Sequence, residues 1–246
     1  REHFGGFSRW EADITSLVKP GKKNEIKLEV TDRLDDISYA SGYAHHPIGG
    51  ILRDVTVYAL PQTNVSDLMI ETDLDDTYTD ASLKVSFDIS RDARVRYSLR
   101  DPKGENVNLP VAVKEVKAGR VNHDFAVAAP LKWDAEHPHL YALDIHLEEA
   151  GKEVCRISRN VGFREIKIDG NKMLVNGQPV KLRGACRHDI HPTLGRTITA
   201  ELDSLDAAIF KHTNMNFVRT SHYPPTERFL DYCDKMGLYV ECETAI

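Results

Sequence analysis

The chain has 246 residues, of which 41% are hydrophobic and 28% are charged, and its formal net charge is -6 at pH 7. This composition is ordinary for a globular protein, and the length exceeds that of one typical domain. The negative charge and the absence of a long basic block argue against nucleic acid or an anionic membrane as the main partner. No uninterrupted apolar run approaches the roughly 18 residues of a membrane span.

Four cysteines are scattered along the chain without CxxC spacing, at Cys155, Cys186, Cys233 and Cys242. We expect free thiols, and cysteines without a pattern are most often buried. The chain begins at Arg1 without an initiator methionine, so we expect an N-terminal part, with any targeting signal, to be missing. We expect a soluble protein, and the sequence leaves its compartment open between cytoplasmic and periplasmic or secreted.

The first 61 residues have the pattern of β structure. Residues 7–14 and 25–30 alternate apolar and polar side chains on either side of a turn at 19–24. Residues 49–57 predict a final strand.

Short alternating strands separated by turns fill residues 65–163. Examples are residues 83–89 and 95–99, followed by a turn at 101–104. About seven such strands in roughly 100 residues predict an immunoglobulin-like sandwich. The chain has no Cys pair of the antibody kind, so apolar packing must hold this sandwich together. We expect Trp133 to be a core residue beside a turn.

The last third of the chain alternates between strands and helices. Asn176 and Gly177 signal a type I′ turn within a hairpin. Strand, helix, strand, helix and strand follow over residues 181–187, 199–213, 216–221, 227–236 and 238–242. The first of these helices has apolar residues at helical spacing, namely Leu202, Leu205, Ala208 and Ile209. This order is typical of the beginning of a parallel (β/α)8 barrel, whose catalytic groups lie at the carboxyl ends of its strands.

Several charged or polar side chains stand at these strand ends. Arg219 lies in an apolar run, and a buried guanidinium needs an acidic partner. Glu241 and Glu243 share one face of the next strand because side chains alternate with a period of two. His188 and His222 each follow a strand, so the sequence predicts a polar cluster at one edge of the sheet.

Residues 216–243 closely resemble the first signature of glycoside hydrolase family 2, which contains β-galactosidases, β-glucuronidases and β-mannosidases. The matching positions are Asn216, Arg219, Thr220, Ser221, His222, Tyr223, Pro224, Phe229, Leu230, Asp234 and Gly237. Residues 5–7, 13–15 and 49–55 resemble the latter half of the family's N-terminal jelly-roll, and Trp133 with residues 137–141 resembles a motif near the end of its second module.

The resemblance implies a multidomain fold of β modules followed by an α/β module. Residues 1–61 would be the C-terminal part of a jelly-roll sugar-binding domain, and residues 62–164 an immunoglobulin-like β-sandwich. Residues 165–246 would be the first strands of a TIM-barrel catalytic domain.

The resemblance also implies roles for four residues. His188, His222 and Glu243 would bind the sugar, and Arg219 would orient the nucleophilic carboxylate. The family often has a non-proline cis peptide in the neighbourhood of His222 and Tyr223. Its acid/base and nucleophile glutamates belong to barrel strands four and seven, which would lie beyond residue 246, so we carry over no catalytic residue and expect this chain alone to be inactive.

The implied activity of the parent protein is that of a retaining exo-β-glycosidase, most often a β-galactosidase. Cys186 stands where the family usually has Asn, Glu241 interrupts a usually apolar run, and residues 41–47 lack an acidic residue typical of β-galactosidases. β-Glucuronidase and β-mannosidase therefore remain alternatives. A non-catalytic carbohydrate-binding or scaffold protein is a rival from another class.

A metal hydrolase is a third alternative, because His188, His191 and His222 could ligate zinc. Pro192 places the first two in a loop, and no acidic or Cys ligand has a convincing spacing, so we expect no metal site and no required cofactor. A cation near the site of the full-length enzyme stays open, as does a homo-oligomer. The pair at residues 45–46 fits a loop better than a ligand set. The expected partner is a carbohydrate substrate.

Overall fold

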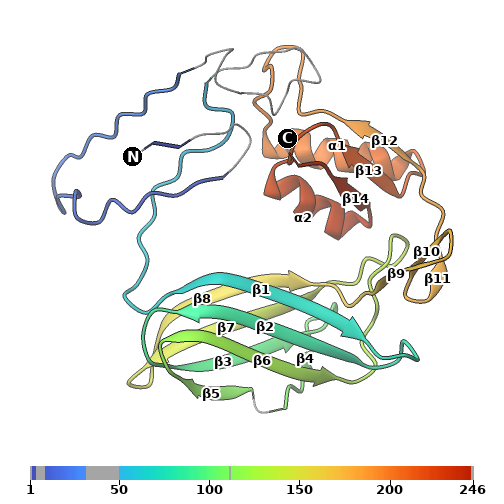
Figure 1. Ribbon diagram of the computed structural model, residues 1–246, viewed down its shortest axis with the longest axis horizontal. Coiled ribbons are helices and arrows are strands. Elements are labelled where there is room, and N and C mark those ends of the chain that lie inside the picture. Colours follow the sequence, from blue (N-terminus) through green and yellow to red (C-terminus); the bar gives the residue numbers. More distant parts are fainter. Residues whose placement is uncertain (1, 4–8, 32–49, 111, 245–246) are drawn as a thin grey trace. The chain divides into compact units, whose positions relative to one another are not determined.

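The computed structural model describes residues 2–3, 9–31, 50–110 and 112–244 (Figure 1). These residues contain fourteen strands and two helices. They divide into two compact units, which we describe separately. The sandwich unit comprises Thr56–Leu182 and Cys233–Leu238, and the parallel-sheet unit comprises Arg1–Val55, Arg183–Tyr232 and Tyr239–Ile246.

The sandwich unit is built from two antiparallel sheets. One sheet has the order β1-β2-β6, with β1 at Val65–Leu74, β2 at Ala81–Ile89 and β6 at Gly119–Val127. The other has the order β4-β3-β7-β8, with β4 at Asn106–Val107, β3 at Ala93–Arg100, β7 at Tyr141–Glu149 and β8 at Lys152–Val161. A further strand, β5 at Val113–Val116, pairs with β3. The short strands expected in this region, and the turn at 101–104, are confirmed.

One apolar core joins the two sheets. Alternate residues of β2, among them Leu83 and Phe87, belong to the same buried cluster as Leu143 and Ile145 of β7. Each such side chain contributes about 1.5 to 3 kcal/mol on burial. The sheets therefore pack face to face through apolar side chains, as expected for a sandwich without a disulfide.

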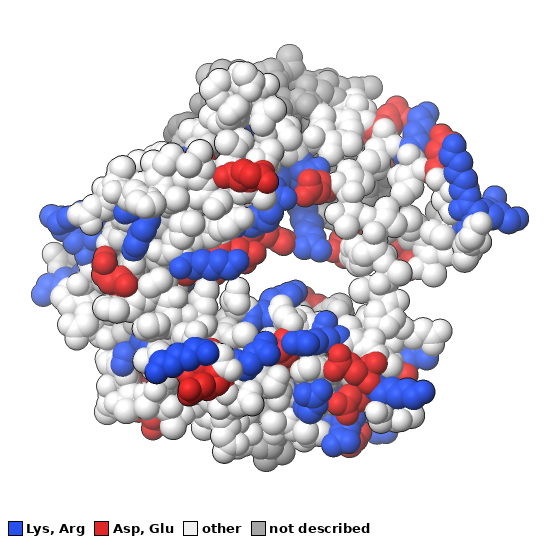
Figure 2. Space-filling model, turned by 180° about the vertical axis from the view of Figure 1, so that it is seen from behind, with Lys and Arg blue, Asp and Glu red and all other residues white. Residues whose placement is uncertain are grey.

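The outer face of the second sheet carries charges of both signs. Asp144 of β7 is buried under two guanidinium groups, 3.1 Å from Arg100 and 2.8 Å from Arg156. In the lower part of Figure 2, Lys and Arg side chains are interspersed with Asp and Glu side chains. This face has balanced charge rather than a field of one sign.

A small hairpin sheet follows the sandwich. It consists of β9 at Ile166–Asp169, β10 at Lys172–Val175 and β11 at Gln178–Pro179. Asn176 and Gly177 both have positive φ, 51° and 77°, as a type I′ turn requires. The hairpin predicted from this dipeptide is confirmed.

The parallel-sheet unit contains three parallel strands, β12 at Gly184–Arg187, β13 at Phe217–Thr220 and β14 at Tyr239–Cys242. The helix α1, at Ala200–His212, connects the first two strands, and α2, at Glu227–Met236, connects the last two. Thr226 caps α2, because its hydroxyl accepts the backbone N–H of Phe229 at 3.1 Å. The predicted β-α-β-α-β order is confirmed, although β12 begins at Gly184 rather than at residue 181. Neither helix is long and apolar enough to cross a membrane within the described part of the chain.

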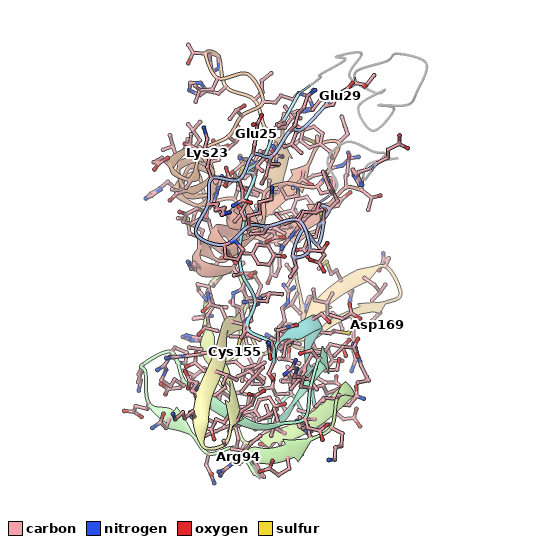
Figure 3. The ribbon with its side chains drawn as sticks, turned by 90° about the vertical axis from the view of Figure 1, so that its left-hand side faces the viewer. Lys23, Glu25, Glu29, Arg94, Cys155 and Asp169 are labelled. Carbon is pink, nitrogen blue, oxygen red and sulfur yellow. The ribbon has the colours of Figure 1, made fainter. Side chains whose placement is uncertain are left out.

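The expectation of strands before residue 61 is wrong for the described residues. Residues 9–31 and 50–64 form no strand, and Lys23, Glu25 and Glu29 project from an irregular segment (Figure 3). Alternation favours an extended chain locally, but a strand also needs a hydrogen-bonded neighbour. The phrases at 5–7 and 41–47, Gly49 and the pair at 45–46 lie outside the described residues.

The burial of two groups of side chains differs from what the sequence suggests. Leu205 and Ile209 of α1 are half-exposed, whereas Asp203 and Ala207 form its buried positions. The apolar pattern alone does not specify the packed face, because Asp203 forms buried ion pairs there. All four cysteines are free as expected, but Cys186 and Cys242 are exposed rather than buried.

Candidate active site

The site lies where the three parallel strands end. His188 directly follows β12, His222 lies two residues after β13, and Glu243 directly follows β14. Neighbouring parallel strands place their carboxyl ends at one edge of a sheet. The structure therefore brings together the side chains that the sequence predicts at these positions.

Glu243 is the acidic centre of this group. One carboxylate oxygen lies 2.7 Å from His222 Nδ1, and the other forms a short ion pair with Arg219. Burial raises the pKa of Glu243, but the His222 hydrogen bond and the Arg219 charge outweigh it and hold the pKa below its usual value. Glu243 is therefore a carboxylate at neutral pH.

Arg219 bridges two acidic residues of β14. Its Nε lies 3.5 Å from Glu241 Oε1, in addition to its contact with Glu243. The two carboxylates share one face, as the strand period requires. The Arg219 side chain is 43% exposed and so is not the buried group that its apolar sequence context suggests. Part of the Arg219 guanidinium therefore remains accessible to solvent.

His188 meets the other two aromatic side chains of the site edge-on. Its ring centroid lies 5.3 Å from that of His222 and 6.4 Å from that of Tyr223. Desolvation lowers the pKa of His188 below its usual value, and the nearby His222 and Arg196 lower it further. A neutral imidazole can both donate and accept a hydrogen bond, which suits contact with hydroxyl groups.

The residues on either side of His188 are buried and anchored. Arg187 lies 2.9 Å from Asp203 and 2.8 Å from Asp206, and it stacks on the Phe229 ring at 3.9 Å. Asp189 also pairs with Arg187. This anchor was not predicted from the sequence, although an acidic residue on the apolar side of α1 is a signal that could have indicated it.

The segment after β13 is held by backbone and hydroxyl contacts. The peptide bond between Ser221 and His222 is cis, in the neighbourhood where the family resemblance implies one. Tyr223 is buried, and its hydroxyl accepts the backbone N–H of Asp189 at 2.8 Å. This bond ties the His222 segment to the His188 loop.

The histidines do not form a metal cluster in the described residues. No group of three or more His, Cys, Asp or Glu side chains in that part of the chain is arranged to hold a metal ion. His191 pairs its backbone with Gly195, and its Nδ1 lies 3.2 Å from the Thr193 hydroxyl.

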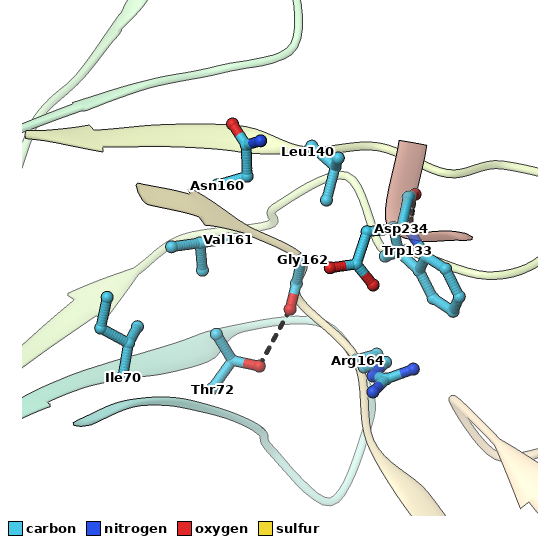
Figure 4. A pocket seen from close by; sticks show the side chains of 9 residues that line it. All are labelled: Ile70, Thr72, Trp133, Leu140, Asn160, Val161, Gly162, Arg164 and Asp234. Carbon is cyan, nitrogen blue, oxygen red and sulfur yellow. Dashed lines mark hydrogen bonds between the residues drawn. The ribbon is translucent and has the colours of Figure 1, made fainter. Parts of the chain in front are cut away.

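A cavity of about 250 Å³ lies in the sandwich unit (Figure 4). Trp133, Asn160, Arg164 and Asp234 are among the side chains that line it. None of the four predicted site residues contributes to its wall, and it carries no arrangement of acid, base or nucleophile. We therefore place the candidate site at the strand ends rather than in this cavity.

Two family models match the chain. Residues 63–164 match the model described as glycosyl hydrolases family 2, and residues 166–246 match the TIM barrel domain of the same family. Together these matches cover most of the chain and meet close to the start of the hairpin.

Two curated β-galactosidases are similar to nearly the whole chain. The protein of Priestia megaterium is 35% identical over 254 residues, which cover 97% of this chain and 24% of that protein. The protein of Pseudoalteromonas haloplanktis is 34% identical over 247 residues, covering 96% and 24%. The chain therefore spans 24% of the length of each of these two relatives.

Solved structures with a similar fold include two β-glucuronidases. That of Parabacteroides merdae has a TM-score of 0.69 and 24% identity over 76% of this chain and 24% of its own, a likeness that shows the fold alone. That of Ruminococcus gnavus, in complex with C6-substituted uronic isofagomine, has a TM-score of 0.67 and 29% identity over 76% and 30%. The same family is indicated by the motif at the strand ends, by both family models and by the curated relatives. The chain belongs to glycoside hydrolase family 2.

Proposed function

We propose that the chain is part of a retaining exo-β-glycosidase that hydrolyses terminal β-linked sugars, with a β-galactosidase as the first candidate. The observation that carries this proposal is the meeting of His188, His222 and Glu243 at the ends of three neighbouring parallel strands. In barrels of this kind such strand ends form the catalytic face.

The contacts suit a sugar-binding role for three of these residues. His188 would exchange hydrogen bonds with sugar hydroxyls, since its lowered pKa keeps the ring neutral near pH 7. Glu243 holds His222 Nδ1 at 2.7 Å, which fixes the orientation of the imidazole ring. Both imidazoles would thus be oriented before a sugar binds, which reduces the entropy lost on binding.

Arg219 would orient the nucleophilic carboxylate. A guanidinium has five N–H donors, and Glu243 and Glu241 engage only its Nε. Its remaining donors could hold a further carboxylate and keep that group ionised.

We propose that the acid/base and the nucleophile are glutamates of later barrel strands, outside this chain. A retaining glycosidase needs two carboxyl groups roughly 5 to 5.5 Å apart across the scissile bond. Glu241 and Glu243 lie in and directly after β14, the third parallel strand, which is too early in the barrel for either glutamate. The 246-residue chain alone would then be inactive.

The domain organisation is also a proposal. Residues 1–61 would belong to a jelly-roll, residues 62–164 to an immunoglobulin-like sandwich, and residues 165–246 to a TIM barrel. The two family matches, at 63–164 and 166–246, support the last two boundaries. The compact units divide the chain differently, since the hairpin at 166–179 groups with the sandwich.

Two observations favour different sugars. The curated relatives are named β-galactosidases, which favours a galactoside. The similar solved structure from Ruminococcus gnavus, at 29% identity, is a β-glucuronidase, which favours a glucuronide as the second candidate. A β-mannoside is a third candidate within the same family.

The test is hydrolysis of a panel of nitrophenyl β-glycosides by the full-length protein that contains this chain. We expect one β-glycoside to be preferred, and His188→Ala, His222→Ala and Arg219→Ala each to lower kcat/KM by roughly 100-fold or more. The matched control is His137→Ala, which removes an exposed histidine of the sandwich unit. A full-length protein that binds glycosides without hydrolysing them would support the carbohydrate-binding rival instead. Turnover that none of the three site variants affects would reduce His188, His222 and Arg219 to structural residues.

A further inference from the structure

A residue from the N-terminal segment contacts the loop that carries His188. Arg53 lies 136 positions before Asp189 in the sequence, yet its Nη2 is 2.5 Å from Asp189 Oδ2. Both residues belong to the parallel-sheet unit. Nη1 of Arg53 also donates to the carbonyl of Leu52 at 3.2 Å, so the guanidinium joins its own backbone to the Asp189 side chain.

Asp189 needs this partner because of where it lies. Its side chain is only 2% exposed, and a buried carboxylate without a partner is strongly unfavourable. Arg187 engages the other carboxylate oxygen, Oδ1, so the two arginines hold the group from both sides. Arg187 is also shared with Asp203 and Asp206. Removing Arg53 would leave Asp189 with Arg187 alone, a guanidinium that Asp203 and Asp206 also share.

The position of Asp189 determines the position of His188. The backbone N–H of Asp189 donates to the Tyr223 hydroxyl at 2.8 Å, and the carbonyl of Arg187 accepts the backbone N–H of Ser221 at 2.8 Å. His188 lies between these two anchored residues, and its own ring makes edge contacts with His222 and Tyr223. A shift of the Asp189 carboxylate would therefore move His188 relative to His222.

We propose that Arg53 is a positioning residue for the candidate site: by holding Asp189, it fixes the loop that presents His188 to the substrate. This inference rests on the proposed function for its catalytic consequence. The geometric part does not depend on that function, since it concerns only the placement of one imidazole. The neighbouring Asp54 provides a comparison, because it pairs with Arg228 in an exposed ion pair of 3.0 Å.

The first experiment measures the geometry in the 246-residue chain by NMR of the histidine ring Cε1–H groups. We expect Arg53→Ala to displace the His188 and His222 signals and to leave those of His137 and His139 unchanged. Arg9→Ala, which removes an exposed arginine of the same unit, should move neither site signal. Unchanged His188 and His222 signals in folded Arg53→Ala would overturn the proposal.

A second variant covers the case in which Arg53→Ala does not fold. Arg53→Lys keeps the positive charge, but it lacks the planar guanidinium that binds both the Leu52 carbonyl and the Asp189 carboxylate. We expect it to fold and to displace the His188 signal by a smaller amount. A His188 signal identical to that of the wild type in Arg53→Lys, together with unfolding of Arg53→Ala, would reduce Arg53 to a structural charge and reject the positioning role.

The second experiment measures the catalytic consequence in the full-length protein, with the nitrophenyl glycoside that it hydrolyses fastest. We expect Arg53→Ala to lower kcat/KM by about 10-fold to 100-fold, because small misplacements of a binding group have effects of this size. Added millimolar guanidinium chloride should restore part of that loss by occupying the vacated place beside Asp189, whereas sodium chloride should not. Asp54→Ala should keep the wild-type rate.

The outcomes of the two experiments separate the two proposals. A wild-type protein that hydrolyses no glycoside refutes the proposed function, while the NMR result still decides the placement of His188. An active wild type whose Arg53→Ala variant retains full activity refutes the positioning role and leaves the proposed function standing. A loss of activity that guanidinium does not restore, with the histidine signals in place, assigns the loss to stability and also refutes the role.

Discussion

Replacement of Trp133 by alanine tests how the sandwich unit is held together. The Trp133 side chain is 2% exposed, and its indole N–H donates to the Asp234 carbonyl at 2.8 Å. The Arg164 guanidinium lies 4.9 Å from the ring centroid. A Cβ built on Gly162 would stand 3.0 Å from the Trp133 Cβ, so Trp133 packs closely against Gly162.

The magnitude follows from these contacts. Truncating a fully buried Trp to Ala costs about 3 to 5 kcal/mol of unfolding free energy. The lost hydrogen bond leaves a carbonyl without its donor and adds about 1 kcal/mol, and the lost cation–π contact adds about 0.5 kcal/mol. Since these contributions overlap, we expect about 4 to 6 kcal/mol in total. That is close to the whole stability of many domains, about 5 to 15 kcal/mol.

The assay is urea unfolding of the 246-residue chain followed by far-ultraviolet circular dichroism. Trp133→Phe keeps most of the ring volume and loses the indole N–H, so it should cost about 1 to 2 kcal/mol. Trp10→Ala is the matched control, because that side chain is 44% exposed and should change stability by less than about 0.5 kcal/mol.

Two results would refute this reasoning. If Trp133→Ala lowered the unfolding free energy of the sandwich by less than about 2 kcal/mol, the surrounding side chains would have to collapse into the vacated space. If Trp133→Phe cost as much as Trp133→Ala, the hydrogen bond to Asp234 rather than ring volume would dominate.

Two further predictions concern the dependence of stability on pH and the substitution of a glycine. Desolvation, and secondarily the Lys114 charge, lowers the pKa of His123 to about 4 from its usual 6.5, so the unfolded state binds more protons between these values. Stability should therefore fall as the pH drops from about 6.5 to about 4, and unfolding curves of His123→Gln should show a flatter pH dependence. Gly237 has a φ of +77°, and a Cβ there would lie 2.3 Å from the Ala135 carbonyl oxygen, so Gly237→Ala should cost more than about 2 kcal/mol in denaturant unfolding. Gly170→Ala, with positive φ but open space, should cost only about 1 kcal/mol, and equal costs for the two glycine variants would contradict the clash.

Features set by neighbours in the sequence could be predicted without the structure. The Asn176-Gly177 turn and the Thr226 cap depend on the conformational preferences of those residues and on hydrogen bonds within a few positions. The cluster of His222 and Glu243 was also predictable, because parallel strands bring their carboxyl ends to one edge.

Features that depend on partners distant in the chain could not be predicted. Residues 25–30 have a strand pattern but no strand, since pairing requires a neighbour that the pattern does not specify. Leu205 is half-exposed, while Asp203 takes a buried position on α1 because Arg187 compensates its charge.

The sequence by itself therefore determined the family, the order of elements from residue 65 onward and the residues at the strand ends, because periodicity, capping and the signature motif are local properties. Only the tertiary structure decided which charges are buried and which groups hold them in place. The contact between Arg53 and Asp189 spans 136 positions and leaves no local pattern in either segment. The physical reason is that the cost of burying a charge depends on the partners that folding brings to it, and these come from any part of the chain.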